Sequence, residues 1–313
     1  MAIEARAFAG PSARGLLAGR LVLADGSTGT ALEAMAPGLG ERAAILPLED
    51  PVLLESLHAS YFAAGSDLVE TATFTASARG LARLAASMAG RDAPGRCATS
   101  GSHQDPAELA YRVNRAAAEA ARRAARAAEE ASGGRRWVAG SMGPGDEPPS
   151  LGASTWAGLR DSYLPQARGL ADGGADLAIV ETCQDPLQAK AAIAALASPE
   201  GGRGLPFIVS ATVDGRGRLL AGTSIPAFVA IMAPFRPLAI GLNCSGGPDE
   251  LEGPLAELAA VSPFPICFMP NAGLPRSEGG RIAWPVTPPE FGAKVSALAR
   301  RYGVAIAGGC CGT

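Results

Sequence analysis

The sequence lacks the features that would direct the chain to a membrane, a secretory route or a nucleic acid. Its first 20 residues include arginines but no apolar run longer than a few residues, so they match neither a signal peptide nor a membrane span. The formal net charge is -3, and there is no basic stripe with interleaved aromatic residues. We therefore expect a cytoplasmic protein with no nucleic-acid partner and no membrane partner.

Histidine and cysteine are also scarce, with two and six residues among 313. His58 falls in a helical pattern and His103 in a polar stretch, and we expect both to be ordinary surface side chains. The cysteines lack the spacing of a secreted disulfide framework, and in a reducing compartment such cysteines suggest a metal site or catalysis. We interpret Cys267 as a core residue, whereas Cys97 lies in the polar stretch and Cys183 ends an apolar run without a companion.

What the sequence does contain is a regular alternation of short apolar runs and helix-like stretches. Eight runs lie at 20–26, 66–74, 137–143, 175–183, 206–213, 238–244, 265–272 and 304–311. Most are apolar at successive positions, which is typical of parallel strands that are covered on both faces. An open sheet would fit this pattern too. Because no dinucleotide-binding GxGxxG follows the first run, we favour an α/β fold of the (β/α)8 TIM-barrel class.

The stretches between the runs predict crossover helices at 50–65, 106–131, 155–173, 185–197 and 289–302. Arg122 to Arg126 alternate with alanines, so we expect a solvated helix face there. Segment 87–105 is polar and rich in glycine and proline, and we expect a surface loop. We predict one domain over residues 1–313, with 1–19 as an N-terminal extension and strands beginning near 20. No eighth crossover helix follows Thr313, so either the barrel is truncated after its eighth strand or the natural chain continues.

Three cysteines follow apolar runs at positions where a barrel would gather them. Catalytic groups of (β/α)8 enzymes lie at the C-terminal ends of the strands. Cys244 ends the sixth run, and Cys310 and Cys311 end the eighth. Three thiolates satisfy zinc and leave its fourth tetrahedral position open, as in a catalytic site. The alternative interpretation is a vicinal disulfide or a set of buried free thiols.

Adjacent residues on a strand point to opposite faces, so two neighbouring cysteines can bind one ion only where the backbone leaves the pleat. The glycines at 308, 309 and 312 provide the conformational freedom for this.

A turn with the sequence DGSTGT follows the first run and suggests recognition of an amino acid. Gly26 and Gly29 allow backbone N–H groups to face an anionic ligand such as a carboxylate. Asp25 and Glu181 are then available to accept hydrogen bonds from an ammonium group. The competing interpretation of a single Asp-Gly pair is a turn without a binding role.

Seven motifs together resemble the homocysteine S-methyltransferase family, and within it the homocysteine-binding module of cobalamin-dependent methionine synthase. They are DGSTGT at 25–30, ETATF at 70–74, GSMGP at 140–144, ET at 181–182, GLNCSGGPDEL at 241–251, NAGLP at 271–275 and GGCCGT at 308–313. The resemblance covers almost the whole chain from about Leu21 onward. GLNC combined with GGCCGT is highly specific, whereas DGxxGT alone would be weak.

The resemblance implies a (β/α)8 barrel whose zinc is bound by Cys244, Cys310 and Cys311, with the homocysteine sulfur as an exchangeable ligand. It also implies that Asp25 and Glu181 contact the substrate ammonium and that the backbone of Gly26 and Ser27 holds its carboxylate. Thr73 and Asn243, which lie within the matching motifs, are further predicted substrate-binding residues. The second motif of the family usually reads ETNTF, so Ala72 removes one polar side chain, and the identity of the thiol acceptor stays open.

The implied reaction is methylation of a zinc-bound thiolate by in-line displacement, which converts homocysteine into methionine. The donor stays open between two branches. NAGLP and GRGRLLAGT at 215–223 favour the methionine synthase branch, in which methylcobalamin, charged from methyltetrahydrofolate, is presented by folate- and cobalamin-binding modules or proteins. The alternative is a stand-alone enzyme that uses S-methylmethionine, S-adenosylmethionine or betaine. A hypothesis of another class is a catalytically silent barrel that acts as a binding protein, with its cysteines oxidised.

Overall fold

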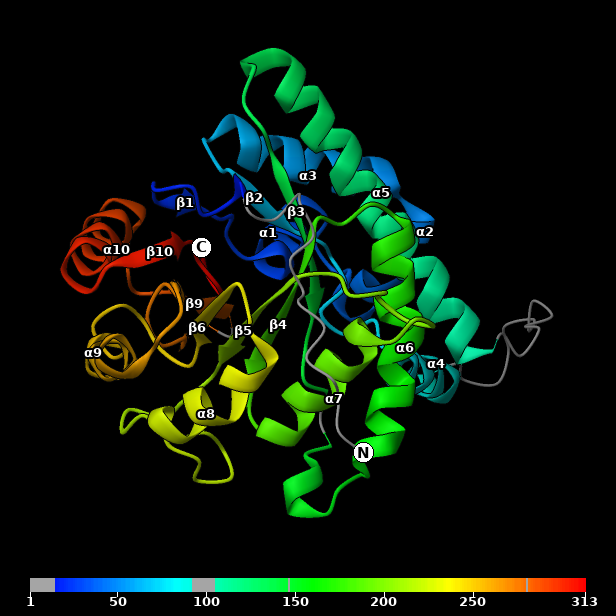
Figure 1. Ribbon diagram of the computed structural model, residues 1–313. Helices are drawn as coiled ribbons and strands as arrows, with labels where there is room; N and C mark the ends of the chain where they lie inside the picture. Colours follow the sequence, from blue (N-terminus) through cyan, green and yellow to red (C-terminus); the bar gives the residue numbers. More distant parts are fainter. Residues whose placement is uncertain (1–14, 92–104, 146, 280) are drawn as a thin grey trace.

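The computed structural model describes residues 15–91, 105–145, 147–279 and 281–313, and its centre is a barrel of eight parallel strands (Figure 1). The strands are β1 (Val22–Leu23), β2 (Leu68–Glu70), β3 (Trp137–Met142), β4 (Leu177–Cys183), β5 (Phe207–Ala211), β6 (Ala239–Cys244), β7 (Ile266–Pro270) and β10 (Val304–Ala307). Strands β2 to β7 pair in chain order, and β10 pairs with both β7 and β1. A bridge between Ala24 and Leu68 joins β1 to β2 and completes the ring. The predicted TIM barrel is confirmed.

Helices form the outer layer of the barrel (Figure 1). They are α1 (Thr28–Met35), α2 (Leu46–Glu49), α3 (Pro51–Ala63), α4 (Ala78–Arg91), α5 (Pro106–Ser132), α6 (Trp156–Asp172), α7 (Pro186–Ala197), α8 (Ile225–Met232), α9 (Glu252–Val261) and α10 (Pro288–Tyr302). The five predicted crossover helices are present within a few residues of the expected bounds. Asp50, Asp105 and Asp185 cap α3, α5 and α7 by accepting backbone N–H groups, and each is followed by a proline that cannot donate.

Segment 87–105 is not all loop, because α4 continues through Arg91. Its Ala- and Arg-rich composition between Ala78 and Arg91 supports a helix despite the glycines at 80 and 90. Residues 92–104, including Cys97 and His103, lie outside the described residues.

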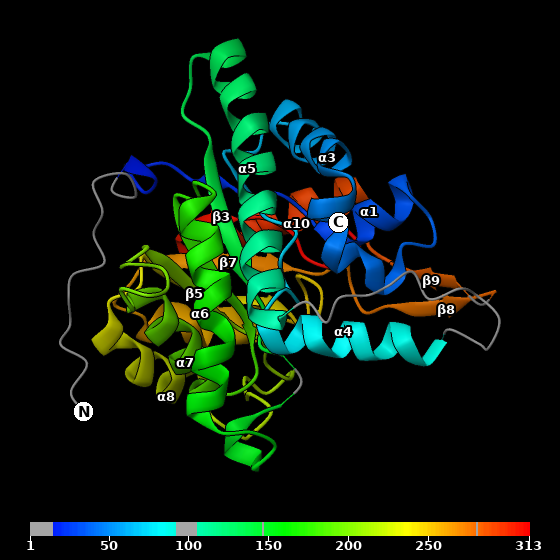
Figure 2. The ribbon, with the colours of Figure 1, turned by 90° about the vertical axis from the view of Figure 1, so that its right-hand side faces the viewer.

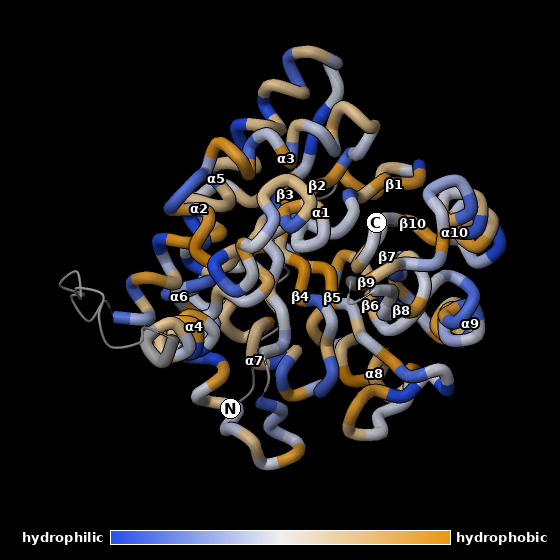
Figure 3. The backbone as a smooth tube through the Cα atoms, turned by 180° about the vertical axis from the view of Figure 1, so that it is seen from behind, coloured by the Kyte–Doolittle hydropathy of each residue, from blue (hydrophilic) through white to orange (hydrophobic). Residues whose placement is uncertain are grey.

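Strand alternation divides the core into two layers. Inside the barrel lie apolar side chains such as Leu68, Leu177, Ile208 and Ile306. Outward-facing residues such as Val69 and Val180 pack against the helices in a larger cluster. The hydrophobic colour along β4 and β5 in Figure 3 marks strands that are buried on both faces. The apolar runs of the sequence therefore correspond to the strands of a parallel barrel.

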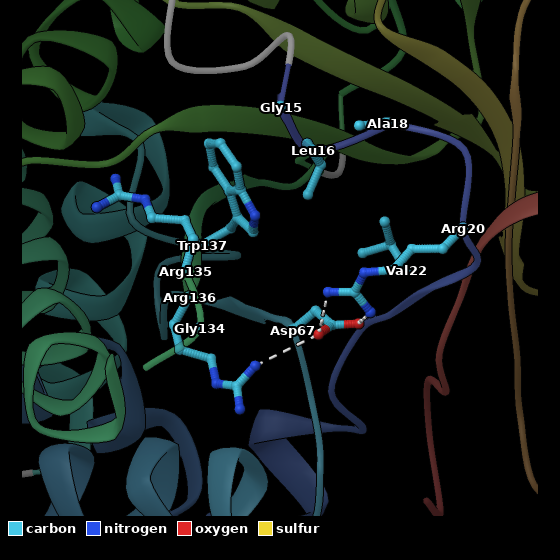
Figure 4. Close-up of a pocket in the computed structure, with 10 residues that line it drawn as sticks. All are labelled: Gly15, Leu16, Ala18, Arg20, Val22, Asp67, Gly134, Arg135, Arg136 and Trp137. Atoms are coloured by element: carbon cyan, nitrogen blue, oxygen red, sulfur yellow. Dashed lines mark hydrogen bonds and ion pairs between the residues drawn. The ribbon is translucent and has the colours of Figure 1, made fainter. Parts of the chain in front are cut away.

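The end of the barrel where the strands begin is closed by residues of the N-terminal extension and by ion pairs (Figure 4). Leu16 is buried there against the inner layer, beside a cavity of about 350 Å³. Arg20 binds both carboxylate oxygens of Asp67, at 2.9 and 2.8 Å, and Arg136 also contacts this carboxylate. Contacts at this end of (β/α)8 folds serve stability.

The prediction of a solvated helix face is wrong for Arg122. Its guanidinium is buried and pairs with Asp176, which also accepts a hydrogen bond from Arg135 at 2.6 Å. The alanine pattern of α5 is the reason, since alanines at 118, 121 and 125 bring this helix against the barrel and draw Arg122 inward.

His58 is likewise buried and not on the surface, with 0% exposure on α3. Both ring nitrogens lack a hydrogen-bond partner, and burial lowers the pKa of His58 to about 4. Leu54 and Leu57 belong to the buried face of the same helix. Because this short helix is apolar on several sides, its periodicity did not show that His58 lies on that face.

The opposite end of the barrel carries the long loops that follow the strands. Figure 2 shows α1, the C-terminus and an antiparallel hairpin of β8 (Arg276–Glu278) and β9 (Arg281–Ala283) on this side. The hairpin was not predicted, because its strands are short and carry no apolar run. No helix within the described part of the chain is both long and apolar enough to cross a membrane.

Candidate active site

Three thiols from two distant segments meet at the mouth of the barrel. Cys244 is the last residue of β6, and Cys310 and Cys311 follow β10. The sulfur atoms of the three cysteines all lie within 4.8 Å of one another, and 3.9 Å separates those of Cys244 and Cys311. All three are free thiols and none is fully buried. The structure therefore brings together the three residues that the sequence analysis predicted as metal ligands.

The separation of the sulfurs suits a tetrahedral ion. Zinc–sulfur bonds of about 2.3 Å place the sulfurs of a tetrahedral site roughly 3.8 Å apart. Three thiolates are also the donors that zinc accepts in catalytic sites with one open position. The residues present therefore fit zinc, both in chemistry and in spacing.

The backbone around the cysteines has left the regular strand. β10 ends at Ala307, so Cys310 and Cys311 lie in a turn, as their predicted convergence requires. Cys244 and Ser245 have φ values of 60° and 61°, a left-handed conformation that non-glycine residues adopt rarely. This conformation turns the end of β6 toward the β10 turn.

Close packing, more than positive φ, explains the glycines before the cysteine pair. A side chain at Gly308 would lie 2.7 Å from the backbone oxygen of Asp25, and one at Gly309 would lie 2.3 Å from the Thr313 hydroxyl. Of the three glycines considered in the sequence analysis, only Gly312 has a positive φ, at 84°. The GGCCG stretch thus lies directly against the turn that follows β1.

Asn271 fixes the position of the cysteine turn. This side chain follows β7, and its Oδ1 accepts a hydrogen bond from the N–H of Cys311 at 3.0 Å. The N–H of Cys310 donates to the carbonyl of Pro270 at 2.8 Å, and Cys311 in turn accepts from the N–H of Ala272 at 2.9 Å. Asn271 opens the NAGLP motif but was not predicted as a site residue, and its place near the end of the run at 265–272 is the signal in the sequence that could have identified it.

The thiol cluster favours one negative charge on Cys244. Hydrogen bonds from Cys310 and Cys311 lower the pKa of Cys244 to about 3. Hydrogen bonding to Cys244 raises the pKa of Cys311 to about 11 and that of Cys310 further. Binding of a divalent metal by all three thiolates must therefore release protons.

A layer of polar side chains lies above the apolar interior of the barrel. Side chains two residues apart on a strand share a face, so each inward apolar residue is followed by an inward polar one. Glu70 follows Leu68, and Glu181 follows Ile179. By the same alternation Ser141, Ser210 and Asn243 complete the layer.

Glu181 is held by partners on both sides. Its Oε1 accepts from the Ser141 hydroxyl at 2.5 Å, and its Oε2 accepts from Asn243 Nδ2 at 3.1 Å. Burial raises the pKa of Glu181, while the hydrogen bond from Ser141 opposes that shift. Asn243 also accepts from the N–H of Thr182 at 2.9 Å, where φ is 53°. Asn243 therefore orients Glu181.

Asp25 is buried, with 2% exposure, and only one of its carboxylate oxygens is bonded. Oδ2 accepts the N–H of Glu70 at 2.9 Å, whereas Oδ1 is buried without a partner. Burial, together with the charge of Glu181, raises the pKa of Asp25 well above its ordinary value. Asp25 and Glu181 thus lie in the same buried acidic layer.

The turn after Asp25 packs against the end of the chain. The N–H of Ser27 donates to the Thr313 hydroxyl at 3.2 Å, and a side chain at Gly26 would lie 2.8 Å from that hydroxyl oxygen. Ser27 also caps α1, where its hydroxyl accepts from the N–H of Thr30. Gly26 and Ser27 therefore lie between the acidic layer and the cysteine turn.

Ala72 and Thr73 follow β2 and lie in different surroundings. The Thr73 hydroxyl is buried and donates to the carbonyl of Ser141 at 2.7 Å, which ties the end of β2 to β3. Ala72 packs against the apolar cluster around Leu54 and Leu57 beneath α1 to α3. The residue at position 72 therefore borders a hydrophobic cluster.

The remaining described cysteines lie away from this cluster. Cys267 is fully buried in the inner layer, as predicted for a core residue. Cys183 packs in the layer between barrel and helices, and burial raises the pKa of its thiol.

Comparisons with known proteins agree with these features. The methionine synthases of Mycobacterium leprae (strain TN) and Mycobacterium tuberculosis (strain ATCC 25618 / H37Rv) are 35% and 36% identical to this chain over 305 and 307 residues. Each alignment includes 95% of this chain but 24% of the relative, so the chain spans about a quarter of their length.

Among solved structures, the metallated form of the homocysteine methyltransferase MmuM from Escherichia coli shares the fold. It has a TM-score of 0.74 at 24% identity, with 96% of each chain covered. The family model for homocysteine S-methyltransferase matches residues 22–313, which include the acidic layer and all three clustered cysteines. The chain therefore belongs to the homocysteine S-methyltransferase family.

Proposed function

We propose that this chain binds zinc through Cys244, Cys310 and Cys311 and methylates the thiol of homocysteine to give methionine. The convergence of the three thiols at the barrel mouth is the observation on which the proposal depends. Family membership and the two methionine synthase relatives support homocysteine as the acceptor.

Different residues bind the amino acid end and the thiol end of the substrate. Asp25 and Glu181 accept hydrogen bonds from the substrate ammonium, and the backbone of Gly26 and Ser27 binds its carboxylate. The thiol then extends toward the cysteine cluster. Asn243 and Asn271 act as positioning residues, because one orients Glu181 and the other holds the turn of Cys311.

Zinc, when bound, stabilises the substrate thiolate at neutral pH, where a free thiol with a pKa near 8.5 stays largely protonated. Three protein thiolates already donate charge, so the substrate sulfur keeps its nucleophilicity. The acidic layer holds the amino acid end so that the sulfur faces the open mouth, and binding in this orientation favours in-line attack on a methyl donor.

We propose methylcobalamin, carried by another module and recharged from methyltetrahydrofolate, as the donor. The support is the identity with two methionine synthases, of which this chain corresponds to about a quarter. S-methylmethionine, S-adenosylmethionine and betaine are the alternatives.

A donor screen with metal analysis tests this proposal. Zinc-loaded protein should consume homocysteine with methylcobalamin and contain about one zinc per chain. Cys244→Ala should lose both the zinc and the activity, while Cys183→Ala, which removes a thiol outside the cluster, should retain both. Protein that is purified under reducing conditions, contains no zinc and gains no thiol alkylation when zinc is added would instead indicate a catalytically silent barrel.

A further inference from the structure

Glu70 lines the barrel beside Asp25 and Glu181, but it has no role in the proposed binding of the substrate. It ends β2, two residues after the inward-facing Leu68, so its side chain lies in the polar layer of the barrel. Its Oε1 is buried and has no hydrogen-bond partner. Burial and the carboxylates of Glu181 and Asp25 raise the pKa of Glu70 well above its ordinary value. Glu70 and Glu181 share a side-chain hydrogen bond, which leaves Oε1 as the unsatisfied atom of Glu70. A buried carboxyl oxygen without a partner destabilises the fold, so a ligand is the natural partner to seek for Oε1.

Asp25 provides an independent sign of the same ligand. Its side chain is 2% exposed, and its Oδ1 is a second buried oxygen without a partner. The N–H of Glu70 donates to the other oxygen of Asp25 at 2.9 Å, so the two residues are tied to each other. The third acid, Glu181, has both oxygens engaged by Ser141, Asn243 and Thr182.

The three acids lack a positive partner of their own. Within the described part of the chain, no arginine or lysine side chain pairs with Asp25, Glu70 or Glu181. Arginine and lysine side chains that do pair with acids lie elsewhere, as at Asp67 and Asp176 in the opposite end of the barrel. The layer therefore offers more carboxyl oxygens without a partner than one contact from Asp25 to a substrate ammonium would use.

An ammonium group has three N–H donors, and each can be satisfied by a separate acceptor. We propose that Glu70 is the third acceptor for the α-ammonium of the substrate, and that it restricts this site to thiols that carry a free α-amino group. This inference rests on the proposed function. It adds a specificity residue to the contacts of Asp25 and Glu181.

With Glu70 as an acceptor, the class of thiol that can bind is set by the α-amino group. A thiol without the amino group leaves the free oxygens of Asp25 and Glu70 buried and unpaired, and sites built to bind a polar group discriminate strongly against analogues that lack it. Homocysteine should therefore bind far more tightly than 4-mercaptobutyrate, which has the same chain and carboxylate but no amino group.

The test compares these two thiols by calorimetric titration into the zinc-loaded protein. Glu70→Gln should weaken homocysteine binding roughly 10- to 100-fold, the loss expected for one hydrogen bond to a charged group. The same variant should leave the Kd for 4-mercaptobutyrate within about twofold, because that ligand makes no use of Glu70. Glu70→Leu should show the same split, and Glu119→Gln, on the exposed face of α5, should change neither Kd.

Thermal unfolding provides a second readout. Glu70→Gln should raise Tm at pH 8, because it removes a buried acid whose charged form is unfavourable. An acid that only supports the fold would lower Tm when replaced.

The outcomes separate the two proposals. Equal weakening of both thiols, or unchanged homocysteine binding in Glu70→Gln, would overturn the role of Glu70 while leaving the proposed function intact. Failure of the wild-type, zinc-loaded protein to bind either thiol would overturn both.

Discussion

At the scale of single residues, the two-residue period of the strands decides which side chains reach the mouth. Glu70 and Glu181 lie two residues beyond apolar side chains that fill the barrel, so each acid enters the layer above them. Cys244 follows Asn243 directly and would face away on a regular strand, but its positive φ changes its direction. Glu70 and Glu181 therefore enter the acidic layer because of the strand pleat, whereas the thiol cluster forms where the backbone leaves the regular strand conformation.

Asp25→Asn tests the ammonium contact. Asparagine keeps the size of the side chain and can still accept the N–H of Glu70, but it loses the charge that binds an ammonium. We expect KM for homocysteine to rise roughly 10- to 100-fold with a smaller change in kcat. Steady-state kinetics with saturating methyl donor measure both constants, and an unchanged KM would contradict the assigned contact.

At the scale of elements, the turn after β10 is the segment on which the site depends. Gly308 lies so close to the turn after β1 that a side chain would sit 2.7 Å from the oxygen of Asp25 and 2.8 Å from Ala24. These are backbone and core atoms, which cannot move aside cheaply.

Gly308→Ala should therefore displace the cysteine turn and weaken zinc binding about tenfold or more, as losses of outer-shell support do. Competition with a chromogenic chelator measures this affinity. Gly253→Ala is the matched control, because a side chain at Gly253 in α9 meets nothing within 4 Å. Equal zinc affinity in the two variants would show that the packing of the turn does not support the metal site.

His58 makes α3 sensitive to acid. Its pKa is about 4 in the folded chain and about 6.5 when unfolded, so the unfolded state binds the proton first as pH falls. The contribution of neutral His58 to the free energy of unfolding is therefore complete above pH 6.5. It falls progressively between pH 6.5 and 4, by about 3 kcal/mol in total.

His58→Leu should flatten this part of the pH profile of unfolding, measured by urea denaturation. Comparison with wild type at each pH isolates His58 from the acidic layer, whose raised pKa values act in the opposite direction. A parallel loss of stability in both proteins on acidification would contradict the buried, neutral state of His58.

The sequence predicts long elements well and special environments poorly. All eight strands and five crossover helices follow from apolar runs and caps, and the convergence of Cys244 with Cys310 and Cys311 follows from barrel topology. Periodicity could not show that His58 and Arg122 are buried, because burial depends on which neighbouring helix packs above them. Glu70 begins the ETATF motif in the sequence, but that its Oε1 is buried without a partner appears only in three dimensions.

At the scale of the whole molecule, the two ends of the barrel have different tasks. The end where strands begin is held by Arg122 and Arg135 on Asp176 and by Arg20 on Asp67. The end where strands finish holds two buried carboxyl oxygens without a partner, on Asp25 and Glu70, and three close thiols. The contacts at the first end serve stability, and the groups available to a ligand lie at the second end, where the active sites of (β/α)8 enzymes are found.

Asp176→Asn should lower stability without affecting the site. It removes the nearer charge partner of the buried Arg122 guanidinium and leaves only Glu129, at 3.9 Å, so we expect a loss of about 3 kcal/mol, at the lower end of the range for a broken buried pair. Asp172→Asn, which disrupts a more exposed pair with Arg203, should cost less than about 1 kcal/mol. Urea denaturation gives both values, and zinc affinity and KM should stay unchanged in each variant. A loss of zinc affinity in Asp176→Asn with the fold intact would contradict the separation of the two ends.

X-ray absorption spectroscopy of the zinc-loaded protein, before and after addition of homocysteine, tests the central proposal most directly. Three sulfur ligands and one lighter ligand should become four sulfurs at about 2.3 Å when homocysteine binds. In Cys244→Ala, Cys310→Ala and Cys311→Ala, the spectrum of any zinc that still binds should show one protein sulfur fewer. A spectrum with fewer than three sulfurs in the wild type, or one that homocysteine does not change, would contradict the account.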